Sequence, residues 1–319
     1  MSLPVFEVYL PSSLQDAVRF LSENVQNTKV IAGGTDLVPS LKQKLFEPQY
    51  LLDIKPIKEL HGIHETPDGG VRIGALTTIT EIVENSLLQH HFSVLQQAAA
   101  TVAGPSLRNV GTLGGNICLD TRCYWYNQSY FWRQSCGFCI KKDGTLCHVA
   151  PGSKMCWAVY SGDTAAALLT LDARLKLVSA RGERLVTLPD FFVNDGLVRN
   201  RMEPDEILSE VLISGKVRDY QGAYEKYRIR GSVDYPLAGV AIAMKVKGSN
   251  GGDEDLRVAL TAVNPLPMLL KDPVSLLWNR EELQKLAQRT AKPLKTSAST
   301  MEYRRHMIGI MLKRALEKM

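Results

Sequence analysis

Five of the six cysteines lie in one short segment, "CYWYNQSYFWRQSCGFCIKKDGTLCHVAPGSKMC", which runs from Cys123 to Cys156. Thiolates bind soft metals and iron–sulfur clusters, and thiol pairs carry out redox exchange. The N-terminal stretch "MSLPVFEVYLPSS" has neither a basic leader nor an apolar core, so we expect no signal peptide and a cytoplasmic location. Disulfide frameworks are rare in that compartment, and the segment is therefore expected to bind metal or to act in redox chemistry.

The spacing of the cysteines leaves three interpretations open. Cys136 and Cys139 form a C-x-x-C pair, which is typical either of half a zinc site or of a redox disulfide. A four-cysteine zinc site normally has a second close pair, but eight residues separate Cys147 from Cys156. An iron–sulfur cluster tolerates looser spacing, because its four thiolates need only converge from a folded loop. The segment is thus an iron–sulfur site, a zinc site or a metal-free redox loop.

Aromatic residues accompany the cysteines. Rings around a cluster can form a dry shell, which limits solvent access and tunes the reduction potential. Alternatively, these rings fill a small core beneath a long loop. The candidates for the shell are Tyr124, Trp125, Tyr126, Tyr130, Phe131, Trp132, Phe138 and Trp157.

Two glycine turns could hold a second ligand. "IAGGTDL" spans Ile31 to Leu37, and "GTLGGN" spans Gly111 to Asn116. Paired glycines let the backbone approach a ligand closely, and successive N–H groups then form a concave anion site suited to a pyrophosphate. Neither turn matches the G-x-G-x-x-G fingerprint, so Rossmann-type NAD binding is not supported. The pair of turns favours a dinucleotide without saying which one.

Periodicity predicts the elements that position these groups. A helix is expected over "SSLQDAVRFLSENV", with Ser13 as its N-cap, and a strand in "TKVI" leads into the first glycine turn. "VRIGALTTITEIVEN" reads as strand then helix, "FSVLQQAAATVAG" as a helix, and "LLTLDARLKLVSARGERLVTLPDFF" as a pair of strands. The stretch "AGVAIAMKVKGSNGGDEDLRVALTAVNP" reads as two strands joined by a Gly-rich turn. The predicted class is α+β.

The C-terminal end, "EYRRHMIGIMLKRALEKM", predicts an amphipathic helix with a solvated basic face, or alternatively a helix that docks a partner. Its apolar face is formed by Met307, Ile308, Met311, Leu312, Ala315 and Leu316.

Composition excludes several classes of protein. The net charge of +5 in 319 residues comes from basic residues spread along the chain, so nucleic-acid binding is not expected. No apolar run is long enough to span a bilayer. No nucleophile, acid–base pair or catalytic metal site is evident. The histidines show no triad or metal spacing; they are His61, His64, His90, His91, His148 and His306.

Four motifs in order give the chain a resemblance to a known family. "IAGGTDL", "VAGPSLRNVGTLGGN", "SGDTAAALLTLDARL" and "YEKYRIRGSVDYPLAGVAIAM" resemble the FAD-binding medium subunits of molybdenum hydroxylases, which include xanthine dehydrogenase and aerobic carbon monoxide dehydrogenase. The resemblance implies a two-lobed FAD-binding domain of the PCMH/vanillyl-alcohol-oxidase type and a C-terminal α+β domain of the CO-dehydrogenase flavoprotein type. The implied boundaries are residues 1–55 for lobe 1, 56–218 for lobe 2 and 219–319 for the C-terminal domain.

The resemblance also implies the FAD ligands. The first glycine turn would wrap the pyrophosphate, and the second clamp would be formed at the second turn. Asp163 would hold sugar or ribityl hydroxyls, and Lys226 would offset negative charge at the flavin, although a surface lysine on a strand is the alternative. The implied cofactor-binding residues are Ile31, Ala32, Gly33, Gly34, Thr35, Asp36, Leu37, Val102, Thr112, Gly115, Asn116, Asp163, Leu208 and Lys226.

Ordinary members of the family that the chain resembles have a shorter connection between the positions of Asn116 and Asp163. The cysteine segment therefore reads as an insertion over about residues 118–160. It resembles the insertion in the medium (beta) subunit of 4-hydroxybenzoyl-CoA reductase, which carries a [4Fe-4S] cluster. That family pattern, C-x15-C-x7-C-x8-C, is matched by Cys123, Cys139, Cys147 and Cys156. The resemblance therefore implies that these four cysteines are the ligands and that Cys118 and Cys136 are not, although Cys136 could substitute for Cys139.

An electron-transfer role follows from the resemblance. Electrons would pass from ferredoxin through the [4Fe-4S] cluster and FAD to a small subunit with two [2Fe-2S] clusters, and then to a large molybdopterin-binding subunit, in a dimer of heterotrimers. The implied reaction is reductive dehydroxylation of 4-hydroxybenzoyl-CoA to benzoyl-CoA in anaerobic aromatic degradation. The alternatives are a flavin subunit of a molybdenum aldehyde oxidoreductase, a stand-alone FAD oxidoreductase and a zinc-stabilised, non-enzymatic binding module.

Overall fold

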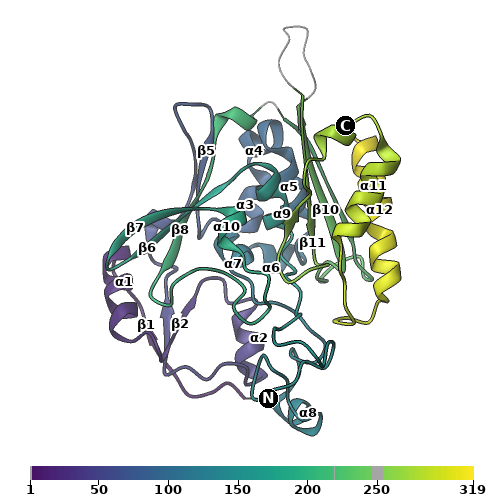
Figure 1. Ribbon diagram of the computed structural model, residues 1–319. Coiled ribbons are helices and arrows are strands. Elements are labelled where there is room, and N and C mark those ends of the chain that lie inside the picture. The colour runs from purple at the N-terminus through teal and green to yellow at the C-terminus, as the bar shows by residue number, and fades with distance from the viewer. Residues whose placement is uncertain (1, 219, 246–253) are drawn as a thin grey trace.

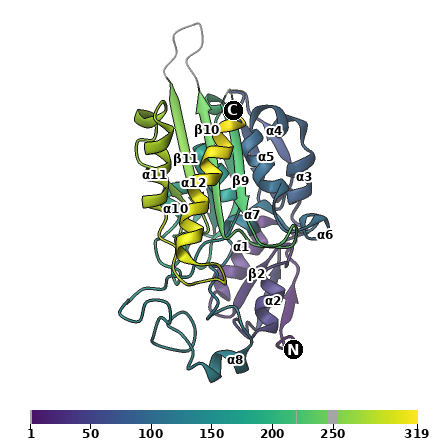
Figure 2. The same ribbon diagram turned by 90° about the vertical axis from the view of Figure 1, so that its right-hand side faces the viewer.

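The computed structural model describes residues 2–218, 220–245 and 254–319. Three β-sheets form its framework, with helices packed between and around them (Figure 1). This mixture of helix and sheet confirms the predicted α+β class. The N-terminal sheet and the cysteine segment occupy the same end of the molecule (Figures 1 and 2). None of the helices in the described ranges combines the length and apolarity needed to cross a membrane.

The N-terminal sheet has the order β1-β3-β2, and all its pairs are parallel. Parallel neighbours require crossover connections, and helices supply them here. The elements are β1 (Glu7–Tyr9), α1 (Leu14–Glu23), β2 (Thr28–Ile31), α2 (Leu37–Lys42) and β3 (Tyr50–Asp53). The predicted cap is confirmed, because the Asp16 N–H donates to Ser13 Oγ at 3.1 Å. The apolar face of α1 packs into a small core that includes Leu52 and Leu60.

The middle sheet is antiparallel and has the order β4-β5-β8-β6-β7. Its strands are β4 (Ile63–Glu65), β5 (Val71–Gly74), β6 (Arg174–Ser179), β7 (Gly182–Thr187) and β8 (Ile207–Ile213). Strands β6 and β7 form the predicted hairpin, and β5 leads into α3 (Ile79–Glu84) as predicted. Thr78 and Glu81 make a capping box at the start of α3.

Further helices lie between this sheet and the C-terminal sheet. They are α4 (Ser86–His91), α5 (Ser93–Ala100), α6 (Pro105–Arg108), α7 (Leu113–Ile117), α9 (Thr164–Thr170) and α10 (Leu188–Phe191), while α8 (Tyr130–Ser135) lies within the cysteine segment. Every residue of α9 is buried, which is the pattern of a core helix. Helix α9 packs against α5 and against two strands of the C-terminal sheet, β10 and β11. Helix α9 therefore packs the part of the chain that carries the glycine turns against the C-terminal sheet.

The C-terminal sheet is antiparallel with the order β12-β11-β10-β9. Its elements are β9 (Gln221–Tyr227), β10 (Ala238–Lys245), β11 (Asp255–Thr261) and β12 (Met268–Leu269), followed by α11 (Arg280–Thr290) and α12 (Met301–Glu317). Helix α12 covers one face of this sheet and packs against α11 (Figure 2). The two predicted strands are confirmed as β10 and β11; the Gly-rich turn between them lies outside the described residues, as does residue 219 at the predicted domain boundary.

Helix α12 buries the predicted apolar face, but its basic face is not wholly solvated. Arg304 is fully buried and donates to the carbonyls of Leu237 (2.8 Å), Leu294 (3.0 Å) and Ala262. Burial lowers the pKa of Arg304 to about 10, so the guanidinium stays charged at neutral pH. Arg304 thus hydrogen-bonds α12 to loops of the C-terminal region. The prediction of a wholly exposed basic face was wrong at this position.

We expect Arg304→Met to lower the free energy of unfolding by about 2 kcal/mol, because it leaves buried carbonyls without a donor. Urea denaturation of the full chain would measure the change. The exposed neighbour Arg305 provides the control, since Arg305→Met should change the free energy by less than about 0.5 kcal/mol. Equal effects of the two substitutions would contradict a structural role for Arg304.

Candidate functional site

The two glycine turns lie directly against one another. A Cβ atom at Gly33 would lie 1.8 Å from the carbonyl oxygen of Val110, so only glycine allows this approach. On the other side, a Cβ at Gly111 would meet Thr35 Oγ1 at 3.7 Å. Gly34 adopts a φ of +70°, which favours glycine. Segments separated by about 80 residues in the sequence therefore form one backbone surface, and all of Ile31–Leu37 is half-buried along it.

The second glycine turn leads into the short helix α7 and is hydrogen-bonded to the start of α9. Thr112 caps α7, where its Oγ1 accepts from the Gly115 N–H at 3.1 Å, and Gly115 itself is exposed. Asn116 Oδ1 accepts from the Thr164 N–H at 3.2 Å and from Thr164 Oγ1 at 2.7 Å. Thr164 follows Asp163 directly. The second clamp and the predicted acidic residue are thus held together by Asn116.

Asp163 and Lys226 form a buried ion pair. Lys226 Nζ lies 3.0 Å from Asp163 Oδ2, and the side chains are 2% and 4% exposed respectively. The Tyr224 hydroxyl donates to Asp163 Oδ1 at 2.7 Å, while Lys226 Nζ also donates to the carbonyl of Thr101 at 3.0 Å, next to Val102. Burial lowers the pKa of Lys226, and the charge on Asp163 opposes this shift. The interpretation of Lys226 as a surface lysine was wrong.

Two of the predicted FAD residues, Asp163 and Lys226, therefore form one buried charge pair, and Val102 follows Thr101, whose carbonyl accepts from Lys226. Leu208 is different, since it lies on β8 inside the central hydrophobic core. Sequence reasoning missed Tyr224, although it lies two positions before Lys226 on β9, where alternate residues share a face of the sheet.

Arg122 connects the first glycine turn to the cysteine segment. It precedes Cys123, forms an ion pair with Asp36, and donates to the hydroxyl of Tyr235 at 2.6 Å. The Tyr235 hydroxyl in turn donates to Asp36 Oδ1 at 3.0 Å. Arg122 Nε is buried and has no hydrogen-bond partner among the residues that the structure describes. A buried guanidinium N–H left free beside a glycine turn fits an anionic group such as a pyrophosphate.

Four cysteines from the insertion line one cavity. Cys123, Cys139, Cys147 and Cys156 are all buried there, whereas Cys118 and Cys136 are not among its lining residues. The other residues that line it are Trp125, Tyr126, Ile140, Lys141, His148, Val149 and Ala158. All six cysteines of the chain are free thiols. Four cysteines that are separated along the sequence therefore lie together at one site in the folded chain.

Burial changes the chemistry of these thiols. It raises the pKa of Cys123 to about 12 and that of Cys156 to about 11. Redox-active thiols need a lowered pKa, because the thiolate is the nucleophile. These two buried groups are therefore poor candidates for a metal-free redox loop.

The arrangement differs from a site for one metal ion. Across the described ranges, no three His, Cys, Asp or Glu side chains are grouped so that they could hold a single ion. Zinc would require its sulfur ligands to converge on one point at about 2.3 Å from the metal. The four cysteines instead surround a shared space.

The predicted aromatic shell is largely absent. Only Trp125 and Tyr126 line the cavity, and Trp125 stacks on His148 with ring centroids 4.5 Å apart. Phe131 is 80% exposed and Tyr130 is 42% exposed. The rest of the lining is formed by His148, Lys141 and three aliphatic side chains, while Trp132 packs behind Trp125 with ring centroids 5.7 Å apart.

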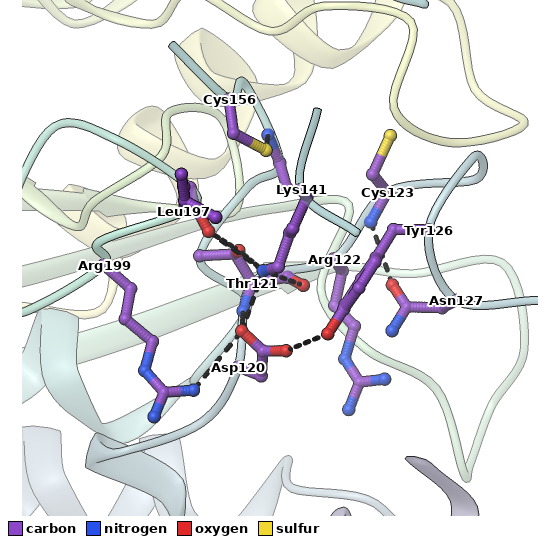
Figure 3. A network of polar contacts seen from close by, with 12 residues as sticks. Asp120, Thr121, Arg122, Cys123, Tyr126, Asn127, Lys141, Cys156, Leu197 and Arg199 are labelled. Carbon is purple, nitrogen blue, oxygen red and sulfur yellow. Dashed lines mark hydrogen bonds and ion pairs between the residues drawn. The ribbon is translucent and has the colours of Figure 1, made fainter. Parts of the chain in front are cut away.

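A buried polar network lies beside the cavity (Figure 3). Lys141 Nζ lies 2.8 Å from Asp120 Oδ1, and Arg199 reaches the same oxygen at 3.3 Å. The Tyr126 hydroxyl donates to Asp120 Oδ2 at 2.9 Å. Burial alone would raise the pKa of Asp120, but Lys141 and Arg199 hold it below its usual value. Burial lowers the pKa of Lys141, and Asp120 opposes that shift. Sequence reasoning missed this network.

Comparisons with known proteins agree with the predicted fold. A family model described as "FAD binding domain in molybdopterin dehydrogenase" matches residues 4–213, and "CO dehydrogenase flavoprotein C-terminal domain" matches residues 222–319. The first model treats residues 4–213 as one domain, so the finer division into two FAD lobes stays a prediction.

Individual relatives span most of the chain. The xanthine dehydrogenase FAD-binding subunit of Escherichia coli O157:H7 is 29% identical over 315 residues, which cover 96% of this chain and 93% of the relative. The aldehyde oxidoreductase FAD-binding subunit PaoB of Escherichia coli (strain K12) is 31% identical over 255 residues, covering 77% of this chain and 78% of the relative.

A solved structure of carbon monoxide dehydrogenase from Hydrogenophaga pseudoflava superimposes with a TM-score of 0.80 at 27% identity, and covers 99% of this chain and 98% of the other. With two family models that together span nearly the whole sequence, the chain belongs to the FAD-binding medium subunits of the molybdenum hydroxylase family, the family of xanthine and carbon monoxide dehydrogenases.

Proposed function

We propose that this subunit holds a [4Fe-4S] cluster in addition to FAD and transfers electrons in a 4-hydroxybenzoyl-CoA reductase. The observation that carries the proposal is the cavity lined by Cys123, Cys139, Cys147 and Cys156. These cysteines have the C-x15-C-x7-C-x8-C spacing, while the two other cysteines of the chain lie outside the cavity. Four thiolates are the usual ligand set of such a cluster.

FAD would be held by the two glycine turns and by the buried ion pair of Asp163 and Lys226. The pyrophosphate would lie along Ile31–Leu37 and the clamp at Thr112, Gly115 and Asn116. The free Nε of Arg122 and the close approach permitted by Gly33 support this placement. Asp163 can accept a flavin hydroxyl as well as its two present donors, because each carboxylate oxygen has two lone pairs. When bound, FAD supplies the exchange of either one or two electrons.

The shared cavity and the spacing of the four cysteines are the support for a cluster. Among the residues placed by the structure, no three His, Cys, Asp or Glu side chains are grouped so that they could hold a single metal ion. The insertion encloses this space with apolar side chains of Ile140, Val149 and Ala158. Such surroundings limit access of water to a cluster. A zinc-stabilised module without flavin also disagrees with membership of a FAD-binding family.

The proposed complex contains a large molybdopterin-binding subunit and a small subunit with two [2Fe-2S] clusters, assembled as a dimer of heterotrimers in the cytoplasm. Ferredoxin would donate electrons to this chain, and the large subunit would remove the phenolic hydroxyl of 4-hydroxybenzoyl-CoA in anaerobic aromatic degradation. That no nucleophile, acid–base pair or catalytic metal site is evident in the sequence is what we would expect if substrate chemistry takes place in another subunit.

Cofactor content tests the proposal directly. On the full chain purified without oxygen, we expect about one FAD, four irons and four acid-labile sulfides, and no zinc. Serine at Cys123, Cys139, Cys147 or Cys156 should remove most of the iron and sulfide, because each substitution removes a thiolate from the cavity. The matched control is Cys136→Ser in the same loop, which should keep the full iron content.

Other outcomes would overturn parts of the proposal. Zinc without sulfide would exclude the cluster. Loss of iron in Cys136→Ser with retention in Cys139→Ser would exchange the assignment of those two ligands. For the complete complex, reduction of an oxidised dye that depends on an aldehyde substrate, without oxidation of reduced viologen on addition of 4-hydroxybenzoyl-CoA, would favour the aldehyde oxidoreductase alternative.

A further inference from the structure

Lys141 is the one lysine, arginine, aspartate or glutamate among the described residues that line the cysteine cavity. Its side chain is only 5% exposed. Its ammonium group passes Tyr126, with Nζ 4.4 Å from the ring centroid, and ends at Asp120. Burial of a charged side chain is unfavourable unless other interactions compensate for it, because desolvation of an ammonium group costs free energy. An apolar side chain at this position would leave Asp120 with Arg199 as its remaining ion-pair partner among the described residues.

The hydrogen bonds of Lys141 hold it in one position. Besides Asp120 Oδ1 at 2.8 Å, Nζ donates to the carbonyl of Gly196 at 2.9 Å and to Thr121 Oγ1. The carbonyl of Thr121, at 3.3 Å, is a fourth acceptor, so all three donors of the lysine are used. The charge is therefore fixed relative to the cavity wall.

The same network holds one of the cysteines. The Cys156 N–H donates to Asp195 Oδ1 at 3.1 Å, and the Gly196 N–H donates to the carbonyl of Cys156 at 2.8 Å. Gly196 thus contacts Cys156 through its N–H and Lys141 through its carbonyl. In the close view, the backbone end of Lys141 lies next to Cys156, and its side chain runs from there toward Asp120 (Figure 3). Lys141 and Cys156 line the same cavity, so a cluster bound to Cys156 would share that cavity with the Lys141 side chain.

We infer that Lys141, held by Asp120, raises the reduction potential of the cluster in this cavity. The inference rests on the proposed function, because it assumes that the cysteines bind a cluster. Reduction adds one negative charge to the cluster, and a nearby cation stabilises the reduced form more than the oxidised form. Net charge near the cluster is one of the factors that set such potentials. Asp120 lies farther from the cavity wall, and its negative charge opposes the effect of Lys141 only in part.

An EPR-monitored redox titration of the full chain, purified without oxygen, tests the inference. With Lys141→Met, we expect the ratio of oxidised to reduced cluster at the wild-type midpoint to rise about tenfold, which corresponds to a midpoint about 59 mV lower for a one-electron couple. With Asp120→Asn, the midpoint should move in the opposite direction by a smaller amount. Opposite signs are the key readout, because structural damage from both substitutions would not produce them.

The two variants are expected to fold. Without Lys141, Asp120 keeps Arg199 at 3.3 Å and the Tyr126 hydroxyl at 2.9 Å. Without the Asp120 charge, Lys141 keeps Gly196 and Thr121. The matched control is Lys142→Met, which removes a half-exposed lysine from the next position in the loop and should leave the midpoint unchanged. Iron and sulfide content, measured for each variant, should equal that of the wild type.

The possible outcomes separate this inference from the proposed function. A wild-type chain without iron and sulfide would overturn the proposed function and this inference with it. A wild-type cluster whose midpoint is the same in Lys141→Met and Lys142→Met would overturn the inference alone. Shifts of the same sign in Lys141→Met and Asp120→Asn would also overturn it, because they would indicate a structural effect and not a charge effect.

Discussion

Gly33→Ala is expected to lower the affinity of the chain for FAD by at least about tenfold. A methyl group at Gly33 would lie 1.8 Å from the carbonyl oxygen of Val110 and 2.6 Å from its carbonyl carbon. Both atoms belong to the backbone, so the two glycine turns must move apart. Overpacking of this kind costs about 1–3 kcal/mol, and about 1.4 kcal/mol already corresponds to a tenfold loss of affinity. Recovery of flavin fluorescence on displacement of FAD would measure the affinity.

A matched glycine serves as the control. A Cβ at Gly152 meets no atom within 4 Å, so Gly152→Ala should keep the wild-type affinity. Wild-type affinity in Gly33→Ala would mean that the contact between the turns does not shape the FAD site. Equal losses in the two variants would point to a general effect of alanine substitution, such as reduced folding yield.

Asp163→Asn is expected to lower the free energy of unfolding of the flavin-free chain by about 4 kcal/mol. The substitution leaves the buried Lys226 cation without its counter-charge, and removal of one member of a buried pair costs about 3–5 kcal/mol. Lys226→Met should have an effect of similar size, because it leaves the Asp163 carboxylate with Tyr224 as its only other donor. Urea denaturation would measure each change, with bound FAD removed because it would add its own stabilisation.

The double variant Asp163→Asn with Lys226→Met should regain most of the lost stability, because no unpaired charge then remains buried. The exposed pair of Lys285 and Glu282 provides the control, since Glu282→Gln should leave the free energy of unfolding nearly unchanged. If Asp163→Asn lowered the free energy of unfolding as little as Glu282→Gln does, the buried pair of Asp163 and Lys226 would not stabilise the fold as we expect from its burial. Lower FAD content in Asp163→Asn would in addition support its proposed role as a flavin ligand.

Local patterns were sufficient to predict many elements. The N-cap Ser13 and the apolar face of α1, the β6–β7 hairpin, and the buried face of α12 are confirmed, since each depends on neighbours a few residues apart. Arg304 is the exception on α12. Periodicity places it on the polar face, but loops from Leu237, Ala262 and Leu294 cover it in the folded chain.

The order of the motifs, the spacing of the cysteines and the course of most helices and strands follow from the amino-acid sequence. The partners of the charged groups become evident in the folded chain. Asp163 meets Lys226 from β9, Lys141 meets Asp120, and Gly33 meets Val110, each across a stretch of chain that no local pattern spans. The physical reason is that helix and strand patterns record the burial of apolar side chains, whereas the pairing of buried charges depends on how the finished layers pack.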